Sequence, residues 1–318
     1  MMDLSIIIVS YNSRADLEGC LAAIAGTAGA LAHEVLVVDN ASADGTVERV
    51  RASFPEVRVL ANKVNAGFTR ANNQGIERSG GRHLLLLNPD TEVGPNALAR
   101  MVEVLDSDPT VGIVSCRLLN TDGSTQYSWR RDASLLWWTA GRVLGLERLV
   151  QRFHIRRMRA ILRRAGPGNV IEVQEVMGAC LMVRRTVVDR IGALDERIFM
   201  SLEDSEFCRR ASRAGWRVVY VPDVTVVHHG GHSARLNLGT ALTEYYRSEM
   251  YFVRLYYGRF TAILHRVLLV VECSVKGIVT LARIAFGRSQ ERGRLRAYQA
   301  TLRAALSRSR PMLPSETR

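Results

Sequence analysis

Short apolar runs alternate with amphipathic stretches along the N-terminal part of the chain. The runs are rich in β-branched residues or leucine and end at turn residues, which predicts buried strands at Leu4–Ser10, Glu34–Asp39, Val57–Leu60 and Leu84–Leu87. Between them, apolar residues recur at helical spacing. Strands that alternate with helices predict βαβ units, and therefore an α/β fold with a mostly parallel, Rossmann-like sheet flanked by helices.

The second half of the chain continues this pattern less regularly. Apolar runs predict further strands at Val111–Cys116, Val173–Val183, Arg217–Val221 and Val224–Val227, and a helix is predicted to begin after Ser201.

The C-terminal part, Leu242–Arg283, is predicted to be helical, followed by a basic tail from Gly287 that is expected to fray. Its densest apolar part, Ile263–Phe286, is interrupted by ionisable residues. A membrane-spanning helix needs about 20 mostly apolar residues, so these interruptions favour attachment at the membrane interface. We therefore expect a catalytic domain over residues 1–240 and a helical, membrane-associating segment over 241–318.

A basic amphipathic insertion is predicted at about residues 135–166. Eight arginines occur from Arg142 onward, and apolar residues share one helical face between them. Such a stretch is typical of a helix that lies on a membrane surface. A pair of surface helices packed on the main domain would produce the same pattern, so both interpretations stay open here.

Composition narrows the class of partner. The chain of 318 residues is 47% hydrophobic, which indicates a globular protein, and its formal net charge is +12. Lys63 and Lys276 are the two lysines; all the other cationic side chains apart from histidine are arginines. A basic surface suits phosphate-bearing ligands or anionic lipid headgroups. No zinc-finger spacing, aromatic-basic RNA signature or long basic run is present, so we expect no nucleic-acid partner.

The five cysteines are odd in number, form no Cys-x-x-Cys pair and lie in apolar contexts. This favours reduced core residues in a cytosolic compartment. The N-terminus, Met1-Met2-Asp3, lacks a basic region ahead of its short apolar run, so we expect no signal peptide.

Acidic or histidine residues recur at the ends of predicted strands and helices: Asp39, Asp90, Glu203, Asp204 and His228. In an open α/β sheet, ligands bind at the carboxyl edge of the strands. Asp39 ends the second strand, where a carboxylate can accept the imide N3–H of uracil or thymine. The same Asp-Asn-Ala-Ser stretch is also good turn chemistry, so a capped loop is the alternative.

Asp90 follows the fourth strand and is suited to a hard divalent cation that neutralises a diphosphate leaving group. One carboxylate is a weak metal site, and His228 is a candidate second ligand because imidazole is acceptable to manganese. The alternatives are a simple Asn-Pro-Asp turn at Asp90 and a structural role for His228. Three histidines within five residues, starting at His228, favour the functional interpretation.

Glu203 and Asp204 lie in the first turn of a predicted helix. Acids there stabilise the helix dipole, which is one explanation for them. The other is a general base that takes a proton from an acceptor hydroxyl. No Gly-x-Gly-x-x-Gly, P-loop or Gly-x-Ser-x-Gly motif is present, which argues against a dinucleotide site, a P-loop site and a serine hydrolase elbow.

Several short motifs follow one another along the chain: Ser-Ile-Ile-Ile-Val-Ser-Tyr-Asn from Ser5, Val-Val-Asp-Asn-Ala-Ser-Ala-Asp from Val37, Asn-Ala-Gly-Phe-Thr-Arg-Ala-Asn-Asn from Asn65, Leu-Asn-Pro-Asp from Leu87, Gly-Ala-Cys from Gly178, Leu-Asp-Glu from Leu194, Glu-Asp from Glu203 and His-His-Gly-Gly-His-Ser from His228. In the sequence and order of these motifs the chain resembles family 2 glycosyltransferases, and most of all the bacterial rhamnosyltransferase-like branch. The resemblance covers roughly residues 4–235 and continues weakly to Phe252.

The resemblance implies a GT-A fold, a nucleotide-diphosphate sugar donor, a divalent metal (Mn²⁺ or Mg²⁺) and inversion at the anomeric carbon. Asp39 matches the base-contacting Asp of the family, Asp90 the last acid of its metal-binding Asp-x-Asp, Asp204 its catalytic base, with Glu203 beside it, and His228 the His of a loop near the metal. The positions expected to contact the nucleotide sugar are Ser10, Tyr11, Asn12, Asp39, Asn65, Gly67, Phe68, Arg70, Asn72, Asn88 and Asp90.

Asn88 departs from the family pattern, because many members have the first Asp of Asp-x-Asp there. Asn at this place is common in the rhamnosyl-like branch, but one carboxylate in place of two lowers the expected metal affinity.

The expected function is an inverting hexosyltransferase of cell-envelope glycan and polysaccharide synthesis, with dTDP-rhamnose as the first candidate donor and a lipid-linked or polysaccharide acceptor. It is expected in the cytoplasm, peripheral on the inner face of the cell membrane. A transferase that uses UDP-galactofuranose, UDP-glucose or a UDP-N-acetylhexosamine is the alternative within the family. A non-catalytic GT-A scaffold and a nucleotidyltransferase are alternatives from other classes. The four retained residues Asp39, Asp90, Asp204 and His228 argue against the scaffold, and the lack of a glycine-rich loop after the first strand argues against the nucleotidyltransferase.

Overall fold

The computed structural model describes residues 2–27, 31–130, 141–142, 145–165, 168–230, 238–286 and 289–306. The chain divides into two compact units. Unit 1 consists of Met1–Ala133, Ala160–Glu196 and Glu203–Ser233, and unit 2 of Ser134–Arg159, Arg197–Leu202 and Ala234–Arg318. The expected functional division at residue 240 stays a prediction.

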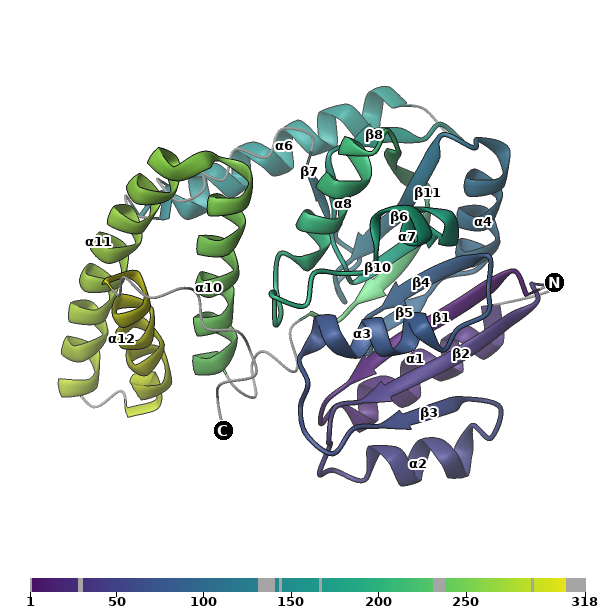
Figure 1. Cartoon of the computed structure of the whole chain (residues 1–318), viewed down its shortest axis with the longest axis horizontal. Helices are drawn as coiled ribbons and strands as arrows, with labels where there is room; N and C mark the ends of the chain where they lie inside the picture. Colours follow the sequence, from purple (N-terminus) through teal and green to yellow (C-terminus); the bar gives the residue numbers. More distant parts are fainter. Residues whose placement is uncertain are drawn as a thin grey trace. The chain divides into compact units, whose positions relative to one another are not determined.

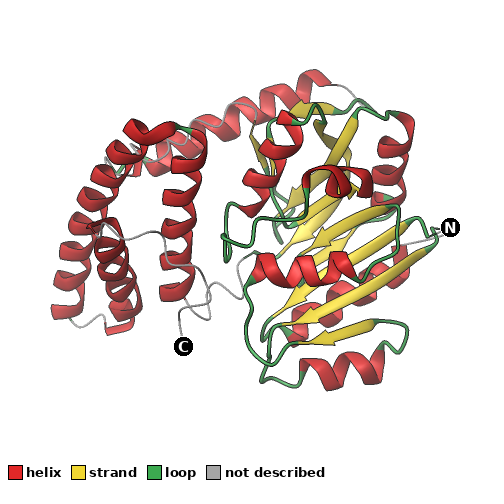
Figure 2. Cartoon of the chain, in the orientation of Figure 1, coloured by secondary structure: helices red, strands yellow, loops and turns green. Residues whose placement is uncertain are grey.

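Unit 1 is built on a mixed sheet, coloured yellow in Figure 2, to which nine strands belong among the described residues. In spatial order the strands are β3 (Arg58–Ala61), β2 (His33–Asp39), β1 (Leu4–Ser10), β4 (His83–Leu87), β10 (Cys180–Arg184), β6 (Val111–Leu119), β11 (Arg217–His228) and β5 (Thr91–Val93), with β8 (Ile171–Val173) paired to β11. Two short strands, β7 (Trp129–Arg130) and β9 (Glu175–Val176), pair separately.

The first four strands are parallel, as the βαβ pattern predicts. Ser10 of β1 lies opposite Asp39 of β2, and Ile8 opposite Leu87 of β4, so the carboxyl ends of these strands meet at one edge. The rest of the sheet is mixed, because β10 runs antiparallel to β4 and β6 and β5 runs antiparallel to β11. The polar ends of β1, β2 and β4 therefore share one edge with the segment that leads into β10.

Helices cover both faces of this sheet (Figure 1). The helices of unit 1 are α1 (Arg14–Thr27), α2 (Thr46–Ser53), α3 (Phe68–Glu77), α4 (Ala97–Ser107), α7 (Arg185–Ile191) and α8 (Glu203–Arg213). Helices α1, α2 and α4 pack on the face that holds Ile6 and Ile8, and α3 packs on the opposite face. There Gly75 comes so close to Ile7 that a Cβ atom would lie 2.5 Å from its Cγ2. All seven residues of β1 are buried, so the strand is the centre of the core.

Unit 2 contains α10 (Leu238–Tyr256), α11 (Gly258–Ala285), a short 3-10 turn (Ser289–Glu291) and α12 (Arg292–Leu306). Each of the three helices contacts the other two, around Tyr246, Leu269, Cys273 and Tyr298. Helix α6 (Glu147–Ala165) contributes residues to both units.

The segment Leu242–Arg283 is helical, as predicted, and consists of two helices that meet at Gly258, whose φ of +80° lies in the region that favours glycine. Two other sequence predictions about elements are wrong. The basic tail from Gly287 is not frayed through its described part, which forms α12. The stretch Val173–Val183 is three short strands rather than one, since β8, β9 and β10 pair with different partners.

Other differences are smaller. The two predicted strands between Arg217 and Val227 are a single strand, β11, with an irregularity between Val221 and Thr225. Residues 135–140, 143–144 and 166 of the predicted insertion lie outside the described residues. All five cysteines are buried and free, as predicted. In the described part of the chain, no helix is both long and apolar enough to cross a membrane.

Candidate active site

The loops that follow β1 and β2 are tied together at the carboxyl edge of the sheet. The Asn12 backbone N–H donates to the Ser42 hydroxyl at 2.9 Å, and the Asn12 side-chain oxygen accepts from the Ala43 N–H at 2.8 Å. Asn12 has a φ of 50°, a left-handed conformation that asparagine tolerates better than most residues. Ser10 adds a hydroxyl contact of 2.9 Å to Ser13. These bonds hold the first two loops in one arrangement beside Asp39.

Asp39 is the least exposed acid of this edge, with 1% of its surface accessible. Its Oδ2 atom accepts from the Ser42 N–H at 2.9 Å, whereas Oδ1 is buried with no hydrogen-bond partner among the described residues. A buried carboxylate oxygen without a donor costs free energy. Asp39 Oδ1 is therefore ready to accept a hydrogen bond from a ligand N–H group.

The loop before α3 is joined to the β2 loop by Asn40. Its side-chain nitrogen donates to the Gly67 carbonyl at 3.1 Å, and its side-chain oxygen accepts from Asn62 at 3.0 Å. Asn65 accepts from the Gly67 N–H at 2.9 Å, and Phe68 packs against Val9, Val38 and Ala71. Asn40 was not singled out in the sequence, although its place directly after a strand end is a signal that could have identified it.

Other residues predicted to bind the nucleotide sugar are less closely connected to this loop network. Asn72 is buried and donates to the Phe68 carbonyl of its own helix at 2.9 Å. Arg70 is exposed, with its Nε atom 4.0 Å from Glu196. Tyr11 is partly buried. The nucleotide-binding roles of these three residues stay predictions.

Asp90 and His228 meet, as the metal-site hypothesis requires. The β5–β11 ladder places His228 opposite Thr91, and the His229 N–H donates to the Asp90 carbonyl at 2.9 Å. This pairing brings His228 Nε2 to 3.4 Å from Asp90 Oδ1 and to 3.4 Å from the Asn88 side-chain nitrogen. His232, the third histidine of the cluster, lies outside the described residues.

Gln126 holds the ring of His228, a contact that no sequence motif signals. Its side-chain nitrogen donates to the His228 carbonyl at 2.6 Å, and its side-chain oxygen lies 3.0 Å from His228 Nδ1. The His228 carbonyl can only accept a hydrogen bond, so the Gln126 side-chain nitrogen must be the atom that faces it. The Gln126 side-chain oxygen then faces His228 Nδ1, and because this oxygen can only accept, Nδ1 must carry a proton. In the neutral ring the lone pair is therefore on Nε2, which faces Asp90 and Asn88.

This donor set fits a divalent ion. Two neighbouring ligands of an octahedral ion with bonds of about 2.1 Å are about 3 Å apart, close to the 3.4 Å between Asp90 Oδ1 and His228 Nε2. The carboxylate oxygen suits Mn²⁺ or Mg²⁺, and of these two ions Mn²⁺ accepts the imidazole nitrogen more readily. Among the described residues no group of three or more His, Cys, Asp or Glu side chains forms a metal cluster. Asp90 and His228 would thus hold the ion together with oxygens of a bound diphosphate and water.

Asp204 lies at the first turn of α8, next to the segment that leads into β10. Its Oδ2 accepts from the Gly178 N–H at 2.8 Å and its Oδ1 from the Ser205 N–H at 2.6 Å. The neighbouring Ala179 carbonyl accepts from the Asn88 N–H at 3.0 Å. The two-residue segment Gly178–Ala179 therefore contacts both Asp204 and the end of β4.

Glu203 differs from Asp204 in exposure. Glu203 is buried, with 7% of its surface accessible, whereas Asp204 is partly exposed. A general base must reach an acceptor hydroxyl. Of these two acids, the structure favours Asp204 for that role.

Comparison with known families now decides the class of the protein. Residues 5–192 match the family described as Glycosyl transferase family 2. The chain belongs to this family. The predicted assignment to family 2 glycosyltransferases of the rhamnosyltransferase-like kind is confirmed, and the protein is a glycosyltransferase.

Two characterised relatives align with most of this family 2 chain. An N-acetylglucosaminyl-diphospho-decaprenol L-rhamnosyltransferase of Mycobacterium tuberculosis is 29% identical over 269 residues, which cover 79% of this chain and 83% of the relative. A low-salt glycan biosynthesis hexosyltransferase of Haloferax volcanii is 29% identical over 234 residues, covering 71% and 67%.

Solved structures support the GT-A-like fold of the glycosyltransferase. The mannosyltransferase of Pyrobaculum calidifontis in complex with GDP-Man and Mn²⁺ has a TM-score of 0.54 at 19% identity, over 95% of this chain and 86% of that one. GalNAc-T7 with UDP, GalNAc and Mn²⁺ has a TM-score of 0.55 at 17% identity, over 71% of this chain and 43% of that one. At these identities the similarity concerns the fold alone.

Proposed function

We propose that this glycosyltransferase moves a sugar, with inversion at the anomeric carbon, from a nucleotide-diphosphate donor to a lipid-linked or polysaccharide acceptor in cell-envelope glycan synthesis. The observation that carries the proposal is the buried Asp39 Oδ1, which has no partner among the described residues at the carboxyl edge. An N3–H group of a thymine or uracil ring would satisfy it, so the donor is a dTDP- or UDP-sugar.

The side chains at the same edge divide the work of the transfer. Asp90 and His228 would hold Mn²⁺ or Mg²⁺, with the His228 lone pair oriented by Gln126. The ion, when bound, neutralises charge that develops on the leaving diphosphate. Asp204 takes the proton from the acceptor hydroxyl while the oxygen attacks the sugar carbon, and the bond to the diphosphate breaks with its electron pair on the phosphate oxygen.

The donor we favour is dTDP-rhamnose. The support is the relative from Mycobacterium tuberculosis, whose name specifies an L-rhamnosyltransferase acting on a diphospho-decaprenol. A UDP-sugar, with a galactofuranosyl, glucosyl or N-acetylhexosaminyl group, is the alternative within the same site chemistry. A lipid-linked acceptor also suits a peripheral location on the inner, cytoplasmic face of the cell membrane, which we include in the proposal.

The test is donor hydrolysis and transfer by purified protein against a panel of dTDP- and UDP-sugars, with and without manganese. Metal-dependent release of dTDP from dTDP-rhamnose supports both the class of donor and the sugar. Release of UDP from one UDP-sugar alone would overturn the choice of rhamnose. If the protein neither releases a nucleotide nor binds one in the presence of manganese, the non-catalytic scaffold becomes the better hypothesis.

A further inference from the structure

Helix α11 carries an unbroken apolar stripe on its exposed side. Phe260, Ile263, Val267, Val271, Val275 and Ile278 follow one another at intervals of three or four residues and are 44–81% exposed. At 1.5 Å per residue this stripe is about 27 Å long. Single exposed apolar residues are ordinary on a protein surface, but a continuous row of this length marks an interaction site.

Three ionisable residues in the middle of α11 lie on its other side. His265 and Glu272 are fully or almost fully buried in unit 2, and Lys276 pairs with Glu272 at 3.0 Å. In the sequence these residues argue against a membrane-spanning helix. In the structure they belong to the side that packs within the unit, so they do not interrupt the exposed stripe.

Charge on unit 2 is distributed unevenly. The acidic side chains that the structure describes in this unit are at most 16% exposed, and each lies within 4 Å of an arginine or lysine: Glu244, Glu249, Glu272 and Glu291. Arg259, at the start of α11, is exposed, and Arg283, near its end, stays 47% exposed although it lies 3.6 Å from Glu291. The described surface of the unit is therefore apolar and basic.

The apolar stripe and the exposed arginines together fit a membrane with anionic lipids. An anionic lipid monolayer accepts apolar side chains below its headgroups and arginines beside its phosphates. A second copy of the unit would bring like charges together, and a nucleic acid would leave the apolar row in water. We propose that the exposed side of α11 inserts into the boundary between headgroups and acyl chains of an anionic membrane, with the helix parallel to the surface.

Arg142 is not expected to bind lipid, although it belongs to the predicted basic insertion. It is 7% exposed and donates to Glu249 at 2.7 and 2.9 Å and to Glu272 at 3.2 Å. It holds unit 2 together and does not face a headgroup. The α11 stripe is assigned from its own exposure and charge, independently of the transferase activity.

The test is flotation of the full chain with vesicles of phosphatidylcholine, with and without phosphatidylglycerol. The variant Ile263→Gln, Val267→Gln, Val271→Gln removes the middle of the stripe at exposed positions, so its circular dichroism spectrum and Tm should stay unchanged. We expect it to need about tenfold more anionic lipid for half-maximal binding, which corresponds to about 1.4 kcal/mol. Val64→Gln, at an exposed valine of unit 1, is the matched control and should bind as the unmodified chain does.

Three results would overturn the inference: no binding of the unmodified chain to anionic vesicles, equal binding by the triple variant, or a concentration-dependent dimer that the triple variant abolishes. Donor hydrolysis in solution should be equal in both proteins, because the stripe contributes no residue to the site at Asp39, Asp90 and Asp204. Failure of the membrane inference is thus separable from failure of the proposed reaction.

Discussion

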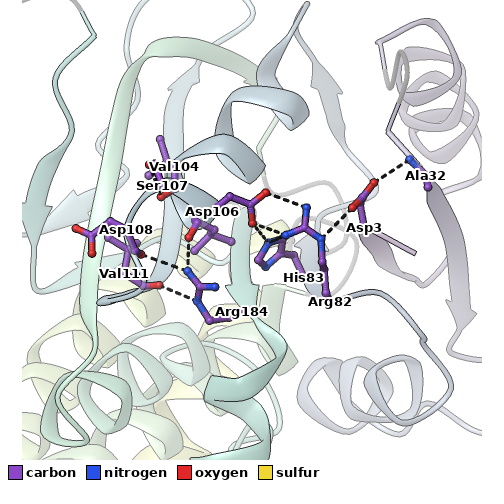
Figure 3. A network of polar contacts seen from close by, with 11 residues as sticks. Asp3, Ala32, Arg82, His83, Val104, Asp106, Ser107, Asp108, Val111 and Arg184 are labelled. Atoms are coloured by element: carbon purple, nitrogen blue, oxygen red, sulfur yellow. Dashed lines mark hydrogen bonds and ion pairs between the residues drawn. The ribbon is translucent and has the colours of Figure 1, made fainter. Parts of the chain in front are cut away.

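Strand β4 has polar groups at both of its ends, and the two ends differ in how those groups are paired. At the amino end, Arg82 binds Asp106 with two nitrogens and donates to Asp3 at 2.9 Å, while His83 Nε2 lies 2.9 Å from Asp106 Oδ1 (Figure 3). At the carboxyl end, Asp90 and His228 stand 3.4 Å apart, and at the same edge of the sheet Asp39 Oδ1, at the end of β2, has no partner among the described residues.

The paired end is largely satisfied by the chain itself. Arg184 continues the network by donating to the carbonyls of Leu105 and Val111, and His83 Nδ1 is the buried atom of this group without a partner among the described residues. Hydrogen bonding to the Arg82 guanidinium holds the pKa of Asp106 down to about 2. Such pairing contributes stability, whereas unfilled acceptors and loosely spaced metal donors become satisfied when a ligand binds. The amino end of the sheet therefore stabilises the fold, and we propose that the carboxyl end binds the ligands of the reaction.

The largest effect expected at the carboxyl end is loss of the catalytic base. Asp204→Asn keeps an oxygen that can accept from the Gly178 N–H but cannot take a proton. We expect kcat to fall about a hundred- to ten-thousandfold in a transfer assay, with donor KM unchanged and a small fall in Tm, because the Ser205 N–H loses its acceptor. Asp106→Asn is the matched control at the other end of the sheet and should retain kcat. Unchanged turnover in Asp204→Asn would remove this residue as the base.

Next in size is the loss of the base-binding acceptor. Asp39→Asn can keep its oxygen toward Ser42, and it then presents an amide nitrogen where Oδ1 stood. Losing a charge-assisted hydrogen bond of about 1.5–3 kcal/mol should weaken the binding of dTDP or UDP about ten- to a hundredfold in isothermal titration. Tm should not fall, because the substitution removes a buried charge that lacks a donor. A fall in Tm with unchanged nucleotide affinity would show that Asp39 stabilises the fold and does not bind the nucleotide.

Removal of the Gln126 side chain, which hydrogen-bonds to His228, should have a comparable or smaller effect. Gln126→Leu leaves Asp90 and His228 in place but no longer sets the proton on Nδ1. Manganese affinity in the presence of nucleotide should fall about ten- to a hundredfold, as for partners of metal-bound histidines elsewhere, measured by electron paramagnetic resonance of free Mn²⁺. Gln151→Leu, at an exposed glutamine of α6, is the control. Equal affinities in the two variants would show that Gln126 has no part in orienting the ring.

The smallest effect is expected at the amino end. Asp106→Asn should lower the free energy of unfolding by about 1–2 kcal/mol, because it weakens a partly exposed ion pair and a hydrogen bond to the buried His83 ring. Chemical denaturation measures this change, and kcat/KM should be unaffected. A loss of activity in this variant without a loss of stability would contradict the division between the two ends.

The same network predicts a pH dependence. The pKa of Asp106 is lowered from 3.8 to about 2, so the folded state binds the proton less readily than the unfolded state. The stability from this group is therefore complete above about pH 4 and is lost as the pH falls toward 2. Between pH 4 and pH 2, the unfolding free energy of Asp106→Asn should change less than that of the unmodified chain. If the unfolding free energy of both proteins changes equally with pH, the Asp106 carboxyl does not cause the pH dependence.

The amino-acid sequence by itself determined the local elements and most of the candidate chemistry. Buried runs such as Leu84–Leu87 and the apolar residues of α1 specify strands and helices because backbone preference and burial are local properties. Motif order was enough to identify the family and to select Asp39, Asp90, Asp204 and His228. It could also have pointed to Asn40, which directly follows a strand.

Tertiary structure alone decided how these parts meet. The contact of Asp90 with His228 depends on β5 pairing antiparallel to β11, and the proton on His228 depends on Gln126, which lies on a loop far away in the sequence. Arg142 and the ionisable residues of α11 look like surface charges in the sequence, yet Arg142, Glu249 and Glu272 neutralise one another inside unit 2. Sheet order and burial are set by contacts between residues distant in the chain, and no local pattern of apolar and polar residues records them.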